Sequence, residues 1–329
     1  MDPELAQKCA DSVLKNHLAA KLLEKRLGYE HPALETNMGG IPLKNPVGLA
    51  AGYDKKCTVL DSISSLGFGF VTGGTITKEP RYGNAKPRIL RIRKSRSLIN
   101  SLGFPNPGLT VALQNINHIN RAGVDHPPRS PIVLSISGTN IPDVVECHYS
   151  LDPSSSAIEL NISSPNTSGL LMFRDLDNLS ELIESINNHR RKPLFLKIGP
   201  FNVSEKSDEL ENIYSLIDLC VRKGINAITI ANTRPINHSG LEVGSGGLSG
   251  EPLFLEMVKM IKTIHPISGS KIDLIACGGI SSGQHAYEAL SSGAAAVQIL
   301  TALVYEGPSV VRNTKKDLVR LKELYSVLT

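Results

Sequence analysis

The stretch AIELNISSPNTSG, residues 157–169, joins a short apolar run at 157–160 to a loop of amide and hydroxyl side chains that contains one proline. A short apolar run that ends in turn-forming residues is typical of a buried strand, and the loop after such a strand displays its side chains. The same residues also favour Asx and Ser turns in an ordinary solvated loop. The rest of the chain decides between these two interpretations.

Seven further apolar runs, rich in β-branched residues, alternate with longer helical patterns. Alternating strands and helices predict a parallel sheet, and eight such units favour an α/β fold closed into a (β/α)8 TIM barrel over an open sheet. Such a barrel can exceed roughly 250 residues as one unit, so we expect a single barrel domain over residues 31–329. The predicted strands are 46–50, 68–72, 132–136, 157–160, 194–198, 227–231, 274–277 and 295–300.

The first 30 residues read as an N-terminal extension made of one amphipathic helix. Asp2, Pro3 and Glu4 supply a capping side chain, a proline at the first helical position and an acidic first turn. Such a helix can lie on a membrane surface or pack on its own domain, and the pattern leaves both open. Its apolar residues are Leu5, Cys9, Val13, Leu14, Leu18 and Leu22, and its basic residues are Lys8, Lys15, Lys21, Lys25 and Arg26.

Two other segments lie outside the alternating series. Residues 88–96 alternate basic and apolar side chains, which predicts an exposed strand or hairpin. The chain ends after Pro308 in a helical pattern whose Leu318, Leu321, Tyr325 and Leu328 share one side, as expected for a helix that completes the barrel wall.

Composition excludes several classes of protein. The 35 basic and 31 acidic residues leave a net charge of +4, too small to indicate a nucleic-acid partner. Five scattered cysteines without paired spacing indicate neither a disulfide framework nor a metal site, and they suit a reducing compartment. No apolar run approaches the roughly 20 residues of a membrane span, and no signal peptide is recognisable. We therefore expect a cytoplasmic protein without a metal.

Polar and small residues follow the predicted strands, where the active site of a parallel barrel forms. Lys197 is the most informative of them, because an ammonium group inside a buried run needs an anionic ligand or a structural ion pair. Glycines after the seventh run and small residues after the eighth suggest a phosphate site, although each glycine also suits a tight turn. The groups are 50–55, 73–75, 161–167, Lys197, 232–233, 244–250, 278–279 and 300–301.

Together these motifs resemble those of the dihydroorotate dehydrogenase family, specifically its class 2, quinone-linked branch. The resemblance covers nearly the whole chain in family order. It rests on NPVGLAAGYDK (45–55), GNAKPR (83–88), INSLGF (99–104), NISSPNT (161–167), ANT (231–233), GGLSG (246–250) and GGISSG (278–283).

The resemblance implies FMN at the barrel mouth and oxidation of dihydroorotate to orotate in pyrimidine biosynthesis. A serine at the position of Ser164 takes the proton from C5, and a hydride passes from C6 to flavin N5. Thr167 is nominated for the proton relay, with Phe104 packed nearby. Serine is a weak base at its free pKa and needs such help. The residues that match the substrate site are Lys55, Asn100, Ser101, Leu102, Gly103, Phe104, Asn166, Asn232 and Thr233.

The same resemblance assigns the cofactor site. Lys197 matches the lysine whose fixed charge stabilises the reduced, anionic flavin. The residues expected around FMN are Ala50, Ala51, Gly52, Lys55, Thr75, Ser135, Asn161, Lys197, Ala231, Ser249, Gly250, Gly278, Gly279, Leu300 and Thr301.

The electron acceptor expected from this branch is a quinone, reached at the inner face of the cell membrane through peripheral contact of the extension. The family extension has two helices, and this chain resembles only the second, so we expect a shortened form. Two alternatives stay open: a soluble acceptor or partner subunit, and a non-catalytic barrel that binds a phosphate ligand. A dihydrouridine synthase, whose barrel also holds FMN, does not fit the sequence. The dihydrouridine synthase would require a cysteine acid and an RNA-binding domain.

Overall fold

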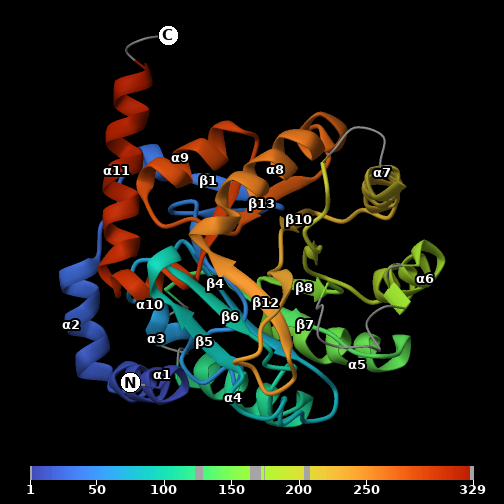
Figure 1. The fold of residues 1–329 in the computed structure, drawn as a ribbon, viewed down its shortest axis with the longest axis horizontal. Coiled ribbons are helices and arrows are strands. Elements are labelled where there is room, and N and C mark those ends of the chain that lie inside the picture. Colours follow the sequence, from blue (N-terminus) through green and yellow to red (C-terminus); the bar gives the residue numbers. More distant parts are fainter. Residues whose placement is uncertain (1, 123–128, 164–171, 174, 204–207, 327–329) are drawn as a thin grey trace.

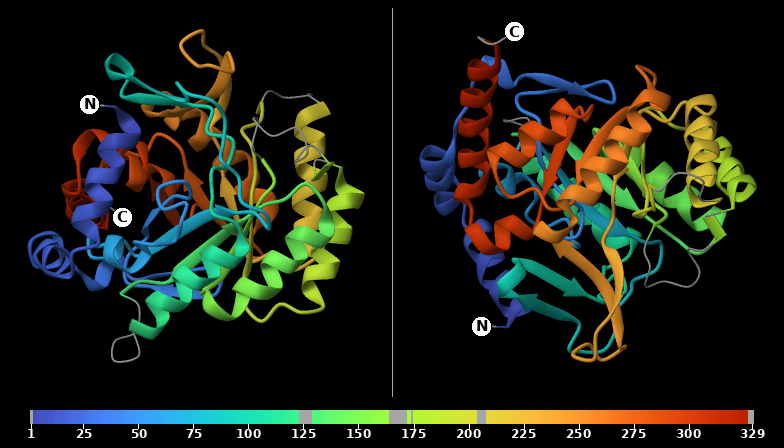
Figure 2. Two further views of the ribbon diagram at one scale, coloured as in Figure 1. Left: turned by 90° about the horizontal axis from the view of Figure 1, so that it is seen from below. Right: turned by 45° about the horizontal axis from the view of Figure 1, so that its top comes forward.

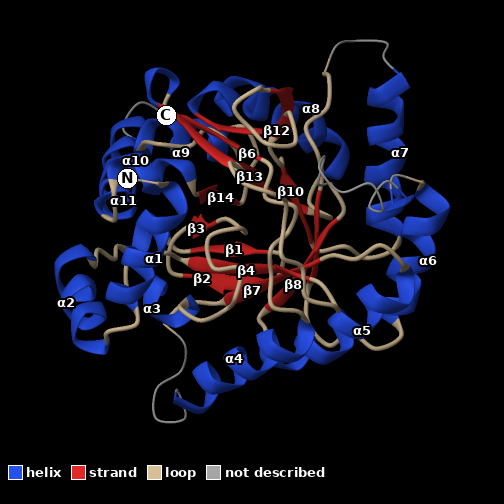
Figure 3. Cartoon of the chain, turned by 60° about the horizontal axis from the view of Figure 1, so that its bottom comes forward, coloured by secondary structure: helices blue, strands red, loops and turns tan. Residues whose placement is uncertain are grey.

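The computed structural model describes residues 2–122, 129–163, 172–173, 175–203 and 208–326 (Figure 1). Its centre is a closed barrel of eight parallel strands in the order β10-β13-β14-β3-β4-β7-β8-β9 (Figure 3). Each predicted run overlaps one of these strands, so the (β/α)8 prediction is confirmed. The strands are β3 (Val47–Leu49), β4 (Phe70–Ile76), β7 (Ile132–Ile136), β8 (Ala157–Asn161), β9 (Leu194–Lys197), β10 (Ala227–Ile230), β13 (Asp273–Cys277) and β14 (Ala296–Ile299).

A short antiparallel hairpin closes the amino-terminal end of the barrel. Its strands β1 (Thr36–Met38) and β2 (Ile41–Leu43) are joined by a turn that uses Gly39 at φ +57°. A Cβ atom at Gly39 would lie 2.4 Å from the Phe195 ring, so only glycine fits beneath it. The hairpin packs on inward-facing strand residues in one cluster of Met38, Ile41, Leu43, Phe70, Val133, Ala157, Phe195, Ala227, Ile275 and Ala296. This end of the barrel is therefore a filled apolar core.

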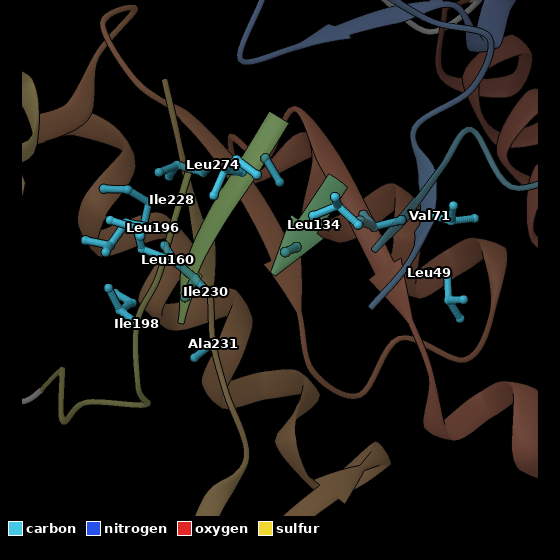
Figure 4. Packing of buried hydrophobic residues seen from close by; sticks show 14 of the residues in the cluster. Leu49, Val71, Leu134, Leu160, Leu196, Ile198, Ile228, Ile230, Ala231 and Leu274 are labelled. Atoms are coloured by element: carbon cyan, nitrogen blue, oxygen red, sulfur yellow. The ribbon is translucent and has the colours of Figure 1, made fainter. Parts of the chain in front are cut away.

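Helices surround the barrel and cover the outward-facing side chains of its strands, such as Leu49, Leu160 and Leu274 (Figure 4). These buried apolar residues supply most of the driving force for folding. The helices are α3 (Leu60–Ser64), α4 (Leu109–Ala122), α5 (Ile141–Leu151), α6 (Leu176–Asn187), α7 (Asp208–Arg222), α8 (Phe254–Ser268), α9 (Gly283–Ser291), α10 (Thr301–Glu306) and α11 (Ser309–Ser326), with short 3₁₀ helices at Pro32–Leu34, Arg93–Ser95, Asp152–Ser154 and Glu251–Leu253.

The N-terminal extension contains two helices, α1 (Pro3–Leu14) and α2 (His17–Leu27), so the predictions of one continuous helix and of a one-helix extension are wrong. The chain breaks at Asn16, whose side-chain oxygen accepts a hydrogen bond of 3.1 Å from the Ala19 amide and caps the second helix. Of the predicted apolar stripe, Leu14 is buried, whereas Leu5, Val13, Leu18 and Leu22 are exposed. The stripe therefore does not pack as a whole on the barrel.

A second, antiparallel sheet of order β11-β12-β6-β5 stands over the carboxyl end of the barrel (Figure 2). Its β5–β6 hairpin confirms the strand predicted within 88–96, and α1 lies against β5. The sheet also joins the barrel wall, because the Tyr305 hydroxyl donates to the Ser97 carbonyl at 2.8 Å. Its strands are β5 (Ile89–Ile92), β6 (Ser97–Asn100), β11 (Arg234–Asn237) and β12 (Ser245–Gly250).

The C-terminal helix α11 packs along α9, as predicted for a helix that completes the barrel wall. Its Leu318 and Leu321 are buried, whereas Tyr325 is 41% exposed and Leu328 lies outside the described residues. No helix among the described residues has both the length and the apolar character needed to cross a bilayer.

Candidate active site

A cavity of about 610 Å³ opens at the carboxyl end of the barrel. The barrel strands form its floor, the second sheet covers one side, and α1 forms part of the remaining wall. Most residues that the sequence nominated line this space. They are Ala50, Ala51, Gly52, Lys55, Thr75, Asn100, Leu102, Gly103, Phe104, Asn161, Lys197, Ala231, Asn232, Thr233, Ser249, Gly250, Gly278, Gly279, Leu300 and Thr301.

Two nominated serines lie behind the cavity wall. Ser135 is fully buried, and its hydroxyl oxygen is 3.1 Å from that of Thr75, so it supports a lining residue without lining the cavity itself. Ser101 is also fully buried, and its carbonyl accepts a 2.8 Å hydrogen bond from the Asn84 amide. Neither serine side chain lines the cavity, so the contacts expected of them with a ligand stay predictions. Ser164, Asn166 and Thr167 lie outside the described residues.

A chain of polar side chains fixes the floor on the side of β8. Asn161 donates from its side-chain nitrogen to the Thr75 hydroxyl at 2.9 Å, and Thr75 contacts Ser135 in turn. The carbonyl oxygen of the Asn161 side chain accepts from the Ser163 hydroxyl at 3.3 Å. Because these groups are buried and hydrogen-bonded to one another, their orientation is set before any ligand arrives.

Lys197 enters the floor from the end of β9 and is only 4% exposed. Among the described residues, the one hydrogen-bond partner of its ammonium nitrogen is the Cys277 sulfur at 3.9 Å. Glu159 lies nearby in the barrel interior, where one carboxylate oxygen accepts from the Thr229 hydroxyl at 2.8 Å. Burial lowers the pKa of Lys197, but Cys277 and Glu159 outweigh burial and raise it above its ordinary value. The floor therefore holds a fixed positive charge.

Lys55 approaches the cavity from the loop after β3, where its ammonium group donates to the Gly52 carbonyl. Burial lowers the pKa of Lys55 to about 8, and the carboxylates of Asp54, Asp11 and Glu4 oppose that effect. Two lysines thus face one cavity, and an anionic ligand would stabilise both.

Amide side chains come from the second sheet and from the end of β10. The Asn232 side-chain nitrogen donates to the Ser163 hydroxyl at 3.1 Å, and its oxygen accepts from the Thr233 amide at 2.8 Å. Asn100 donates to the Gly247 carbonyl at 3.4 Å. Gly247 also lets the Thr233 side chain pack against this strand, since a Cβ atom there would lie 2.0 Å from the Thr233 hydroxyl oxygen. The arrangement offers both donors and acceptors to a planar, amide-containing ligand.

Phe104 lies at the cavity rim in the left-handed backbone region, with φ +56°, which is uncommon for a bulky side chain. The Asn106 side-chain nitrogen holds it there by donating to the Phe104 carbonyl at 2.8 Å. Backbone strain of this kind often occurs where a side chain is aimed at a ligand.

Residues of α1 and β5 also line the cavity, and the sequence did not nominate them. Gln7 donates from its side-chain nitrogen to the Tyr53 carbonyl at 2.5 Å, which ties the helix to the loop of Lys55. The remaining lining residues of this wall are Pro3, Ala6, Ala10, Val13, Leu14, Leu23, Ile89, Arg91 and Tyr305. For those within the first 30 residues, the amphipathic pattern is the one signal in the sequence that could have indicated them. Within the described part of the chain, no three His, Cys, Asp or Glu residues gather as metal ligands.

Comparisons with known proteins agree with this geometry. The family model described as dihydroorotate dehydrogenase matches residues 33–321. A dihydroorotate dehydrogenase (quinone) of Sphingopyxis alaskensis is 34% identical over 304 residues, covering 88% of this chain and 82% of that protein. Another of the same name, from Coxiella burnetii, is 33% identical over 331 residues, covering 95% and 92%.

A crystal structure supports the same grouping. The dihydroorotate dehydrogenase of Eimeria tenella, in complex with ferulenol, superposes with a TM-score of 0.85 at 30% identity, and the match covers 99% of this chain and 93% of that one. The chain therefore belongs to the dihydroorotate dehydrogenase family, in its quinone-linked branch.

Proposed function

We propose that this protein oxidises dihydroorotate to orotate with bound FMN and passes the electrons to a quinone. The observation that carries the proposal is one cavity that joins the strand-end lysines and asparagines of the barrel to the apolar side of α1. A cavity that connects a polar floor to an apolar wall suits two chemically different reactants.

The residues present fit a flavin mononucleotide. Lys197 offers a buried positive charge whose one described hydrogen-bond partner is a sulfur atom at 3.9 Å, so an anionic group can approach it. Gly250 and Gly279 let this wall of the cavity pack tightly on neighbouring protein backbone. Cβ atoms there would lie 2.4 Å from the Arg96 carbonyl and 2.5 Å from the Phe254 amide nitrogen. The Ser249 and Thr301 hydroxyls, 2.8 Å apart, add polar groups on that side. These residues, with those around Thr75 and Asn161, would hold the cofactor, which supplies hydride acceptance.

The substrate is held by the second set of side chains. Asn100, Asn232 and Thr233 match the donors and acceptors of a pyrimidine ring, and Lys55 neutralises its carboxylate. Asn166 completes this set in the proposal. Fixing the ring against a rigid floor converts the reaction into an oriented, effectively unimolecular step.

Ser164 is the base that removes the C5 proton, and Thr167 carries that proton onward. Phe104 covers the reacting face, where a bulky ring excludes water. A serine acting as a base needs a positioned neighbour, because its ordinary pKa is far above neutrality. Lys197 would hold a positive charge beside the bound cofactor, where it would stabilise negative charge.

The acceptor reaches the cofactor along the two-helix extension, residues 1–30. Ala6, Ala10 and Val13 line the cavity with small or apolar side chains, as a quinone ring requires. Leu18 and Leu22, 77% and 59% exposed on α2, provide the apolar contact of a peripheral helix with the inner face of the membrane.

The test is reconstitution of the purified protein with FMN followed by an acceptor panel. We expect the protein to bind FMN, dihydroorotate to reduce it, and ubiquinone or menaquinone to reoxidise it faster than fumarate or NAD. Faster reoxidation by fumarate or NAD would favour the soluble-acceptor alternative. Failure to bind FMN would overturn the enzyme proposal itself.

A further inference from the structure

One face of α1 holds the loop that carries Lys55 in two places. Gln7 donates to the Tyr53 carbonyl at 2.5 Å, and the Asp11 carboxylate, four residues further along the helix, acts electrostatically on the Tyr53 side chain. Residues four apart lie on the same side of a helix, so the two contacts act together. Tyr53 precedes Lys55 by two residues and lines the same cavity.

Asp11 is a half-buried carboxylate whose charge is incompletely matched. Its Oδ1 atom is inaccessible and accepts no hydrogen bond from a described residue, and Asp11 forms no ion pair with one within 4.0 Å. The groups that act on it are Tyr53, the carboxylate of Asp54, and the ammonium groups of Lys15 and Lys55. Lys15 is exposed, so water screens it, whereas Lys55 shares the enclosed side of the helix.

The charges that face Lys55 come from several elements. Asp54 belongs to its own loop, Asp11 and Glu4 belong to α1, and Arg88 precedes β5. Glu4 is already engaged, because its carboxylate pairs with Arg88 at 2.7 Å and with Lys86 at 2.8 Å. Asp11 has no such partner among the described residues. Asp11 is therefore the carboxylate of α1 whose negative charge can act on Lys55.

We propose that Asp11 is a positioning residue of the active site, which fixes the Lys55 loop through Tyr53 and keeps Lys55 charged for an anionic substrate. The inference rests on the proposed function, in which Lys55 binds dihydroorotate and orotate. In this proposal α1 has two roles, because it lines the route of the electron acceptor and also positions Lys55. The extension thereby contributes to substrate binding at the opposite end of the cavity.

The test is the pH dependence of orotate binding to FMN-loaded protein, measured by calorimetry so that turnover is not needed. Removing a neighbouring negative charge makes a lysine lose its proton at lower pH. Asp11→Asn should therefore bind orotate as the unmodified protein does at pH 6.5, and roughly three- to tenfold more weakly at pH 9. Tyr53→Phe, which keeps the carboxylate but loses its contact, should show a smaller loss in the same direction.

Asp218→Asn on α7 is the matched control, because it makes the same change in an exposed ion pair with Arg222, on a helix that contributes no residue to the cavity lining. Its binding should follow that of the unmodified protein at both pH values. An Asp11→Asn profile identical to that of the control, or equally weakened at both pH values, would overturn the proposal. If Asp11→Asn does not fold, a Tyr53→Phe profile identical to that of the unmodified protein would overturn the proposal instead. Absence of orotate binding in the unmodified protein would instead contradict the proposed function.

Discussion

The Lys197 ammonium nitrogen lies 3.9 Å from the Cys277 sulfur, and the two side chains meet on the cavity floor from β9 and β13. Burial raises the pKa of the Cys277 thiol, and Glu159 raises it further, whereas Lys197 opposes both. Lys197 thus makes only a weak hydrogen bond to the Cys277 sulfur, and its positive charge stays available to a ligand.

Replacing Lys197 should therefore destabilise the reduced form of the bound cofactor more than it destabilises the fold. Lys197→Met keeps the apolar stem and removes the charge, so we expect the reduction potential of bound FMN to fall and its reduction by dihydroorotate to slow by about 10²- to 10³-fold. Stopped-flow absorbance and a redox titration measure the two effects. Lys259→Met, an exposed substitution on α8, is the control. An unchanged potential in Lys197→Met would contradict the assigned role.

Ser164 is expected to act in the chemical step alone. Ser164→Ala should bind FMN and orotate normally and reduce the flavin about 10²- to 10⁴-fold more slowly, because a general base contributes that much to the rate. Single-turnover reduction by dihydroorotate isolates the step. Ser168→Ala tests whether any serine of the loop suffices, and we expect it to retain the rate. Normal reduction by Ser164→Ala would remove this residue from the mechanism.

The acceptor route can be blocked without removing the extension. Ala6 lines the cavity from α1, and Ala6→Trp would fill the space beside it. We expect turnover with a quinone to fall at least tenfold, while reduction of bound FMN by dihydroorotate stays unchanged, because only the second half-reaction uses this wall. Ser12→Trp, on the exposed side of the same helix, controls for the added ring. Equal losses in both half-reactions would mean that the helix is purely structural.

Much of this architecture could be predicted because strand ends meet in a parallel barrel. The sequence assigns residues as distant as Gly52 and Thr301 to one site, and both line the cavity. Their roles toward a ligand remain predictions. The barrel strands themselves were recognisable because each apolar run ends in polar or glycine residues.

The sequence does not predict which residues lie close together where that depends on side-chain packing between distant segments. Nothing in the spacing of Asp11 and Tyr53, or of Glu159 and Cys277, indicates that the two members of each pair lie near one another. The break at Asn16 was missed because the apolar periodicity continues across it, although an asparagine is a recognised helix cap.

His148 provides a test of stability that is separate from function. It is 1% exposed within α5, and its Nε2 atom has no hydrogen-bond partner among the described residues. Burial lowers the pKa of His148 to about 4, with Arg190 and His189 acting in the same direction and Asp152 opposing them. The unfolded chain therefore binds a proton between pH 6.5 and about 4 that the folded protein does not, so stability falls as pH falls through this window.

His148→Leu should abolish that part of the pH dependence, because leucine fills similar space without titrating. Urea unfolding at pH 7 and pH 4.5 measures it: we expect the unmodified protein to lose about 2 to 3 kcal/mol more than the variant between these values. His118→Leu, at an exposed histidine on α4, is the matched control and should lose as much as the unmodified protein. Parallel losses in His148→Leu and the unmodified protein would show that His148 becomes protonated within the folded protein at its ordinary pKa. The acid sensitivity would then have to come from other groups.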